Sequence, residues 1–331
     1  MKNIYTYCLL ALLPLLTAAC GQREVTDDMA DSVKLELLDL NIEQDPDNAE
    51  LLAARARVLL NLHRTQEASF DITRALQNDP KNLDYLLLKS DIFFASGNIE
   101  ESYRTLEEAE RMAPDNREVQ LKLGEITFYS RDYDRSLRYL TNVTERDGNN
   151  RTALFMKGFI YKEKGDTANA VQIFRRVCDK FPDFAPAYEQ LGVLYASVNN
   201  PLAVEYLSTA LNLEPSNTNT MYALALYYQD RKEMENAETL YHQILDINPA
   251  SADAWHNLGY IELFFYRDYP RAIEYFTKAL ENNSEYIEAY ANRGSAYELN
   301  GDKTQARADY EKALSINATY QPALEGMKRI K

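Results

Sequence analysis

Residues 255–260 of the 331-residue chain read Trp-His-Asn-Leu-Gly-Tyr, and Ala272, Phe276 and Ala279 follow at helical spacing. The chain is built from repeated units of about 34 residues, whose bounds are given below. Gly259 is the eighth residue of its unit, and Ala272 is the twentieth once one inserted residue is allowed for. Small residues recur at both positions: Ala56, Ser90, Gly124, Gly158, Gly192, Ala225, Gly259 and Gly294 at the eighth, and Ala68, Ser102, Ser136, Ala170, Ala203, Ala237, Ala272 and Ala306 at the twentieth. Because two helices approach closely only where small side chains lie between them, the pattern predicts an antiparallel helix pair in each unit.

Prolines give the length of the unit. They occur at 46, 80, 114, 182, 215 and 249, with spacings of 34, 34, 68, 33 and 34 residues. Proline, or a small residue in its place, ends one helix and lets the next begin. The sequence thus predicts eight units, over 49–82, 83–116, 117–150, 151–184, 185–217, 218–251, 252–286 and 287–320. Capping helices are expected within 29–48 and 321–331. The one-residue changes in the fifth and seventh units are expected to lie in the turn between the paired helices.

The stretch at 255–260 and its repeats resemble the tetratricopeptide repeat, and the resemblance covers residues 49–320. It implies an all-α fold, a right-handed superhelix (α-solenoid) of about eight helix-turn-helix repeats. The first helix of each pair would line a concave groove. Each unit alone cannot cover its apolar face, and stacking on its neighbours does so.

Composition argues against several functions. The chain has 36 Lys and Arg against 51 Asp and Glu, a net charge of −15, whereas nucleic-acid binding needs clustered cations. Three Cys and three His exclude a disulfide framework and leave few zinc ligands. No phosphate-binding glycine loop, G-x-S-x-G or C-x-x-C motif is present. We therefore expect a protein that is not an enzyme, with no cofactor, no metal site and no nucleic-acid partner.

The first residues resemble a bacterial lipoprotein signal. Lys2 precedes an apolar stretch from Cys8 to Leu16, which is too short to cross a bilayer as a helix. Residues 17–20 read Thr-Ala-Ala-Cys and resemble a lipobox, although Thr17 stands where the family usually has Leu. The resemblance implies a signal peptide over 1–19, acylation (palmitate) at Cys20 and a lipidated tether over 20–28. A plain secreted protein and an uncleaved short anchor are the alternatives.

In the repeat family, positions 2, 5, 6, 9, 12 and 13 of the first helix point into the groove. Carried over to this sequence, they place apolar and aromatic residues in units two to four and polar ones in units seven and eight: Leu87, Phe94, Leu121, Phe128, Tyr129, Phe155, Phe159, His256, Asn257, Tyr260 and Asn292. Such a strip would mark a partner site. Alternatively, several of these aromatic residues pack against the adjacent repeat.

These features predict a membrane-tethered scaffold or adaptor lipoprotein of the bacterial cell envelope, at the outer membrane. Its groove would hold a protein or peptide segment of an envelope assembly or secretion machine. Asn257 and Asn292 resemble the asparagines that hold a peptide backbone, because an amide both donates and accepts. No lysine occupies the fifth position of any unit, which disfavours capture of a terminal carboxylate. The alternatives are a regulatory or recruiting subunit for a cell-wall or glycan-processing enzyme, and a self-associating structural subunit.

Overall fold

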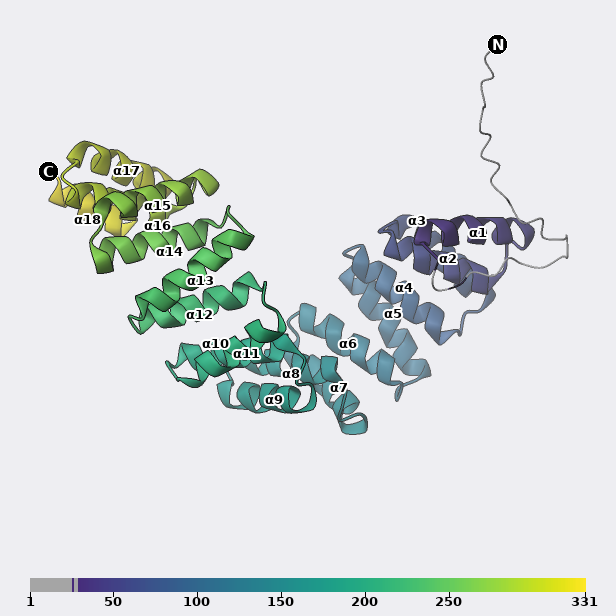
Figure 1. The fold of residues 1–331 in the computed structure, drawn as a ribbon. Coiled ribbons are helices and arrows are strands. Elements are labelled where there is room, and N and C mark those ends of the chain that lie inside the picture. The colour runs from purple at the N-terminus through teal and green to yellow at the C-terminus, as the bar shows by residue number, and fades with distance from the viewer. Residues whose placement is uncertain (1–25, 27–28) are drawn as a thin grey trace, which may run out of the picture. The chain divides into compact units, whose positions relative to one another are not determined.

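The structure, a computed structural model, describes residue 26 and residues 29–331. In that part of the chain it contains eighteen α-helices and one π-helical turn, and no strand (Figure 1). The predicted all-α solenoid of helix-turn-helix repeats is confirmed. The expected signal peptide, Cys20 and all of the tether except Thr26 lie outside the described residues.

The helices follow one another in pairs. They are α1 (Asp31–Gln44), α2 (Ala49–Asn61), α3 (Thr65–Asn78), α4 (Leu83–Ala95), α5 (Ile99–Met112), α6 (Arg117–Tyr129), α7 (Tyr133–Arg146), α8 (Arg151–Glu163), α9 (Thr167–Lys180), α10 (Ala185–Ser197), α11 (Leu202–Leu213), α12 (Thr218–Asp230), α13 (Met234–Ile247), α14 (Ala252–Ile261), η1 (Glu262–Tyr266), α15 (Tyr269–Asn282), α16 (Ile287–Leu299), α17 (Lys303–Ile316) and α18 (Gln321–Arg329). The chain divides into two compact units, one ending at Val143 and the other running from Thr144 to Lys331.

Local side chains explain where the first helix of most pairs begins and ends. Asparagine side chains cap α2, α4, α6, α8 and α12, and the Asn116 carboxamide, for example, accepts from the backbone N–H groups of Glu118 and Val119. Caps of this kind satisfy N–H groups that have no partner within the helix. At the other end the backbone turns left-handed once per repeat: at His63, Gly97, Arg131, Gly165, Asn199, Lys232, Arg267 and Gly301. This conformation closes the helix and starts the turn to its partner.

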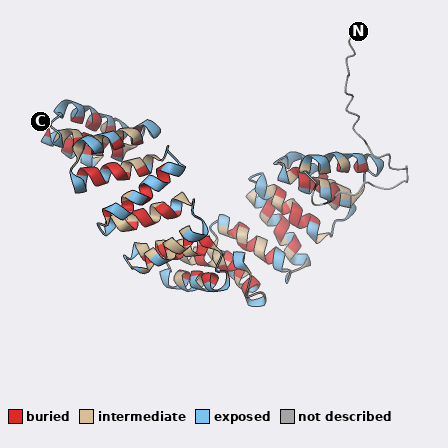
Figure 2. Ribbon diagram, viewed as in Figure 1, coloured by how far each residue is buried: buried red, intermediate tan, exposed pale blue. Residues whose placement is uncertain are grey.

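The small residue at the eighth position makes room for a large residue of the partner helix. A Cβ atom added at Gly158 would lie 2.6 Å from the Phe174 ring, and one at Gly259 would lie 2.9 Å from Phe276. Phe174 and Phe276 are at the twenty-fourth position and are fully buried. At these crossings a small residue of one helix therefore faces a large residue of its partner helix, in addition to the contacts between small residues. Buried residues lie along the sides that the helices turn to one another (Figure 2).

The inserted residue of the seventh unit is absorbed inside a helix. We expected it in the turn between the paired helices. Instead α14 continues into the π-helical turn η1, and the backbone N–H of Asp268 donates to the Glu262 carbonyl over a distance of 3.0 Å. In the eighth unit the equivalent bond, from Asp302 to Tyr297, spans five residues rather than six. A π turn accommodates one extra residue without interrupting the helix.

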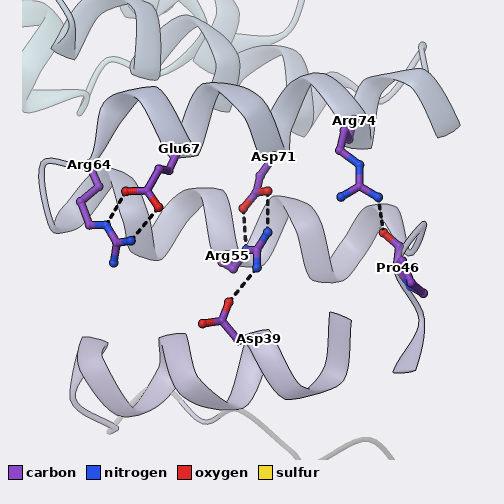
Figure 3. Close-up of polar contacts among 7 residues, drawn as sticks. All are labelled: Asp39, Pro46, Arg55, Arg64, Glu67, Asp71 and Arg74. Atoms are coloured by element: carbon purple, nitrogen blue, oxygen red, sulfur yellow. Dashed lines mark hydrogen bonds and ion pairs between the residues drawn. The ribbon is translucent and has the colours of Figure 1, made fainter. Parts of the chain in front are cut away.

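The first and last helices are halves of the same repeat. α1 has the length and position of a second helix, and its Asp45 N–H donates to Asn41 as that of Asp79 does to Ala75 after α3. Arg55 of α2 joins it to the next pair: Nε and Nη2 each lie 2.7 Å from an oxygen of Asp71, and Nη1 lies 2.7 Å from Asp39 of α1 (Figure 3). At the other end α18 packs on α16 and α17 in the position of a first helix.

Candidate partner-binding surface

An exposed aromatic group lies where α4 and α6 end. The ring centroids of Phe94 and Tyr129 are 5.1 Å apart, and those of Phe128 and Tyr129 are 5.7 Å apart. Tyr129 is 62% exposed and Phe94 is 38% exposed. We call Phe94, Phe128 and Tyr129 the aromatic patch. The sequence predicted all three as groove residues, and the structure brings them together because they occupy the twelfth and thirteenth positions of successive first helices.

The two predicted leucines differ in accessibility. Leu87 is 4% exposed and packs in a core cluster with Leu106 and Val119, so it is part of the interior and is not accessible to a partner. Its expected place on the accessible groove surface is therefore corrected, because the next first helix covers its side chain. Leu121, one repeat later, is half-buried.

Phe155 and Phe159 of α8 pack mainly inward. The Phe155 ring centroid lies 5.0 Å from that of Phe159, 5.6 Å from that of Phe174 and 4.9 Å from that of Phe184. Both rings are half-buried against the core cluster of α8, α9 and α10. These ring contacts lie within the repeat 151–184, so they differ from the alternative stated above, in which aromatic residues pack against the adjacent repeat. Only part of each ring is left at the surface.

The polar groove residues of the seventh and eighth units bind side chains of neighbouring units. Asn257 is 7% exposed, and its Nδ2 donates to the Tyr222 hydroxyl over 2.9 Å. Asn292 Nδ2 lies 3.0 Å from His256 Nε2. Burial lowers the pKa of His256, so a neutral imidazole accepts this amide N–H. Both amides thus already donate to neighbours within the protein, and a peptide backbone would have to displace these bonds.

Tyr260, the last predicted groove residue, belongs to a second exposed aromatic group. It is 38% exposed, and its ring centroid lies 4.6 Å from that of Phe264. Phe264, Phe265 and Tyr266 follow in the π turn and are exposed as well. The sequence predicted Tyr260 as a groove residue but did not mark the run 262–266 as a site. Its signal was the one-residue insertion beside three consecutive aromatic residues.

Metal ligands and the Cys178 thiol are the other chemically active groups of the described residues. No three of their His, Cys, Asp and Glu side chains are placed to hold a metal ion. Cys178 is buried, and burial raises the pKa of its thiol to about 12, which keeps it protonated and unreactive. Within residues 26 and 29–331, no helix combines the length and apolar character needed to span a membrane.

Comparison with known proteins identifies the repeat. Profiles described as tetratricopeptide repeat match residues 53–117, 152–183 and 287–320. The chain is 30% identical over 118 residues to a Drosophila melanogaster protein named protein O-mannosyl-transferase Tmtc3, which covers 35% of this chain and 13% of that protein. It is 26% identical over 188 residues to the Glycine max Hsp70-Hsp90 organizing protein 1, covering 53% of this chain and 31% of that protein. The chain thus spans less than a third of either relative.

A solved structure shares the fold over most of the chain. The C-terminal part of a repeat-containing protein of this family from Cytophaga hutchinsonii aligns with a TM-score of 0.62 and 18% identity, covering 74% of this chain and 99% of that one. At this identity the likeness concerns the fold alone. It agrees with the helix pairs described above.

Proposed function

We propose that this tetratricopeptide-repeat protein is a lipid-anchored scaffold of the bacterial cell envelope. The premise is its repeats, which have the protein-interaction fold of that family. The aromatic patch would bind a segment of a partner protein that belongs to an envelope assembly or secretion machine. The observation that carries the proposal is the exposure of Tyr129 and Phe94 beside each other on successive repeats.

Physical chemistry supports a partner at this patch. Covering large exposed aromatic side chains is favourable because it releases the water ordered around them, and such side chains are enriched in the energetic centres of protein interfaces. Tyr129 also has a hydroxyl that can bond a polar group at the rim of an interface. Similarity to a protein named as an organizer of Hsp70 and Hsp90 supports protein binding in general. The match to a named transferase covers too little of that protein to suggest catalysis here.

Photocrosslinking in cells tests the patch. A photoreactive amino acid replaces Tyr129 in one variant and Phe70 in another. Phe70 is a matched control, because it is an aromatic residue of similar exposure, 64% against 62%, but lies on the second helix α3. We expect Tyr129 to give a discrete adduct that Phe70 does not, and Phe94→Ala to reduce it. The same adduct from both positions would contradict the proposal.

The mass of the adduct separates the alternative functions. An adduct with a cell-wall or glycan-processing enzyme would favour the recruiting subunit. An adduct of twice the chain's mass would favour self-association, which the mass in solution would then check. Either result keeps the patch and changes what the patch binds.

The lipid anchor is a separate part of the proposal. With a net charge of −15 the protein is repelled by anionic headgroups, so the acyl chains at Cys20 would have to hold it at the membrane. We expect Cys20→Ala to move the protein from the membrane pellet to the soluble fraction. The wild-type chain and a Cys178→Ala variant are the controls. Continued sedimentation of Cys20→Ala with membranes would contradict lipid anchoring.

A further inference from the structure

Glu262 is a buried charge at a position that is uncharged elsewhere. It is the eleventh residue of its unit, and the other seven units have Leu59, Phe93, Thr127, Tyr161, Tyr195, Tyr228 and Tyr297 there. Its side chain is 1% exposed. Burying a carboxylate costs free energy unless other groups compensate it. The repeat itself does not require a charge at this position, so the structural role of the repeat does not explain Glu262.

The compensation that Glu262 receives is incomplete. Oε1 lies 2.9 Å from Arg271 Nη1, but within the described residues neither carboxylate oxygen accepts a hydrogen bond of good geometry. Arg271 is half exposed and also donates to the Tyr275 hydroxyl over 2.9 Å. Buried polar groups in native proteins are nearly always hydrogen-bonded, and exceptions often mark a ligand site.

Glu262 faces an open hollow of about 590 Å³ between α13, the π turn and the start of α15. Glu235 and Glu238 of α13 and Asp268 before α15 also line it, against one guanidinium, that of Arg271, and the imidazole of His242. Four carboxylates therefore face one permanent cation. The hollow, which we call the acidic hollow, has a surplus of negative charge.

The π turn adds aromatic surface beside this charge. Phe265 and Tyr266 are 46% and 43% exposed, and Tyr266 donates its hydroxyl hydrogen to Glu238 Oε2 over 2.9 Å. Aromatic faces attract guanidinium and ammonium groups. A carboxylate can bind a guanidinium through two parallel hydrogen bonds. Because no three of the described His, Cys, Asp and Glu side chains can hold a metal ion, the arrangement suits an organic cation.

We propose that the acidic hollow binds the guanidinium group of an arginine side chain presented by a partner protein. The carboxylate of Glu238 would receive its N–H groups, the buried charge of Glu262 would add to the attraction, and the Tyr266 ring would cover one face. This site lies in the compact unit that runs from Thr144 to Lys331, whereas the aromatic patch lies in the compact unit that ends at Val143.

Proton NMR of the full-length protein tests the proposal with arginine amide as the probe. The chain has only three histidines, and His242 alone lines the hollow. We expect the His242 ring signals to shift saturably with arginine amide, while those of His63 do not. Citrulline amide, which has the same shape without the charge, should give at least a tenfold weaker effect.

Two variants make the test specific. Glu262→Gln keeps the shape of the side chain and removes the charge, and should weaken the His242 response at least fivefold. Glu281→Gln, on the exposed surface of α15, is the matched control and should respond as the wild type does. If Glu262→Gln does not fold, judged by its helical circular dichroism, Glu238→Gln serves in its place.

Equal responses to arginine and citrulline amides, or an unchanged response in the folded charge variants, would overturn the proposal. So would the absence of a saturable shift in the wild type. Tyr129→Ala should leave the response unchanged, so failure of the aromatic patch and failure of the acidic hollow are distinguished.

Discussion

At the scale of single residues, Gly192 shows why the repeat needs a residue without a side chain. A Cβ atom there would overlap Leu207 and approach the Leu207 backbone nitrogen to 3.0 Å. Backbone does not move aside as the end of a flexible side chain does. The overlap with Leu207 therefore cannot be relieved locally.

We expect Gly192→Glu to destabilise the protein by more than about 2 kcal/mol, because overpacking and a buried charge act together. Gly148→Glu is the control, since a Cβ atom at Gly148 would make only ordinary contacts, with the tip of Arg176 at 3.4 Å and the Thr144 carbonyl oxygen at 3.8 Å. Urea unfolding followed by the helical circular dichroism signal measures both. Equal midpoints for the two variants would contradict the predicted helix crossing in the fifth unit.

Glu262 gives a pH prediction at the same scale. Burial raises its pKa, Glu238 and Asp268 add to the increase, and Arg271 opposes it. A carboxyl group whose pKa is higher in the folded state binds more protons folded than unfolded, so its contribution to stability falls as pH rises through the interval between the two pKa values. The Glu262→Gln variant has no carboxyl group at this position, so it does not lose stability in this way as pH rises.

The stability of Glu262→Gln relative to wild type should therefore increase from the unfolded pKa of a glutamate upward and level off above the raised pKa. Urea midpoints of both proteins across this interval measure it, with Glu281→Gln as the control. A constant difference at all pH values would show that the pKa of Glu262 is not raised.

At the scale of helices, the Arg55 network holds the first helix in place. Asp71 is buried, with its side chain 2% exposed, whereas Asp39 on α1 is 51% exposed. The same pair recurs in the eighth unit, where Arg293 Nε and Nη2 lie 2.8 Å from the oxygens of Asp309. The buried aspartate therefore depends on its arginine, whereas the exposed Asp39 contact adds to the packing of Leu38 and Ile42 of α1.

We expect Arg55→Met to destabilise the first unit by about 3 kcal/mol or more, because it leaves the Asp71 carboxylate buried without its ion pair. Adding Asp71→Leu should restore much of the loss. Asp39→Asn should cost less than about 1 kcal/mol, since it removes an exposed pair. Thermal unfolding by circular dichroism measures all three. A loss for Asp39→Asn as large as that for Arg55→Met would contradict this ranking.

Much of the helical framework could be read from the sequence, because small residues at helix crossings and prolines between pairs leave a strong period. The π turn could not, since an inserted residue such as the one near Phe265 fits equally well into a longer loop. The sequence predicted which face of α4 carries Leu87, but it could not predict that the Leu87 side chain is buried. Which part of a face the next helix covers depends on how adjacent pairs stack, and the sequence of one repeat does not contain that information.

At the scale of the whole molecule, contacts between helix pairs are local. The pairs touch their neighbours along the chain, and the two compact units each have their own core clusters. In such a chain stability is approximately a sum of repeat and nearest-neighbour terms. Unfolding need not be all-or-none.

This locality predicts that a change in the first unit will be reported unevenly. The single tryptophan, Trp255, belongs to the seventh repeat. We expect Arg55→Met to lower the melting temperature of part of the helical circular dichroism signal. The melting temperature reported by Trp255 fluorescence should fall by less. Coincident shifts of both signals would indicate that the chain unfolds as one cooperative unit.

Among the described helices, the first, α1, is the back half of the module, and the last, α18, is the front half. Everything between them is made of whole modules. A gene that duplicated or lost one 34-residue cassette would therefore keep both end surfaces and change only the number of units between them. Length is the property of this architecture that evolution, or an engineer, can alter in discrete steps without redesigning either terminus.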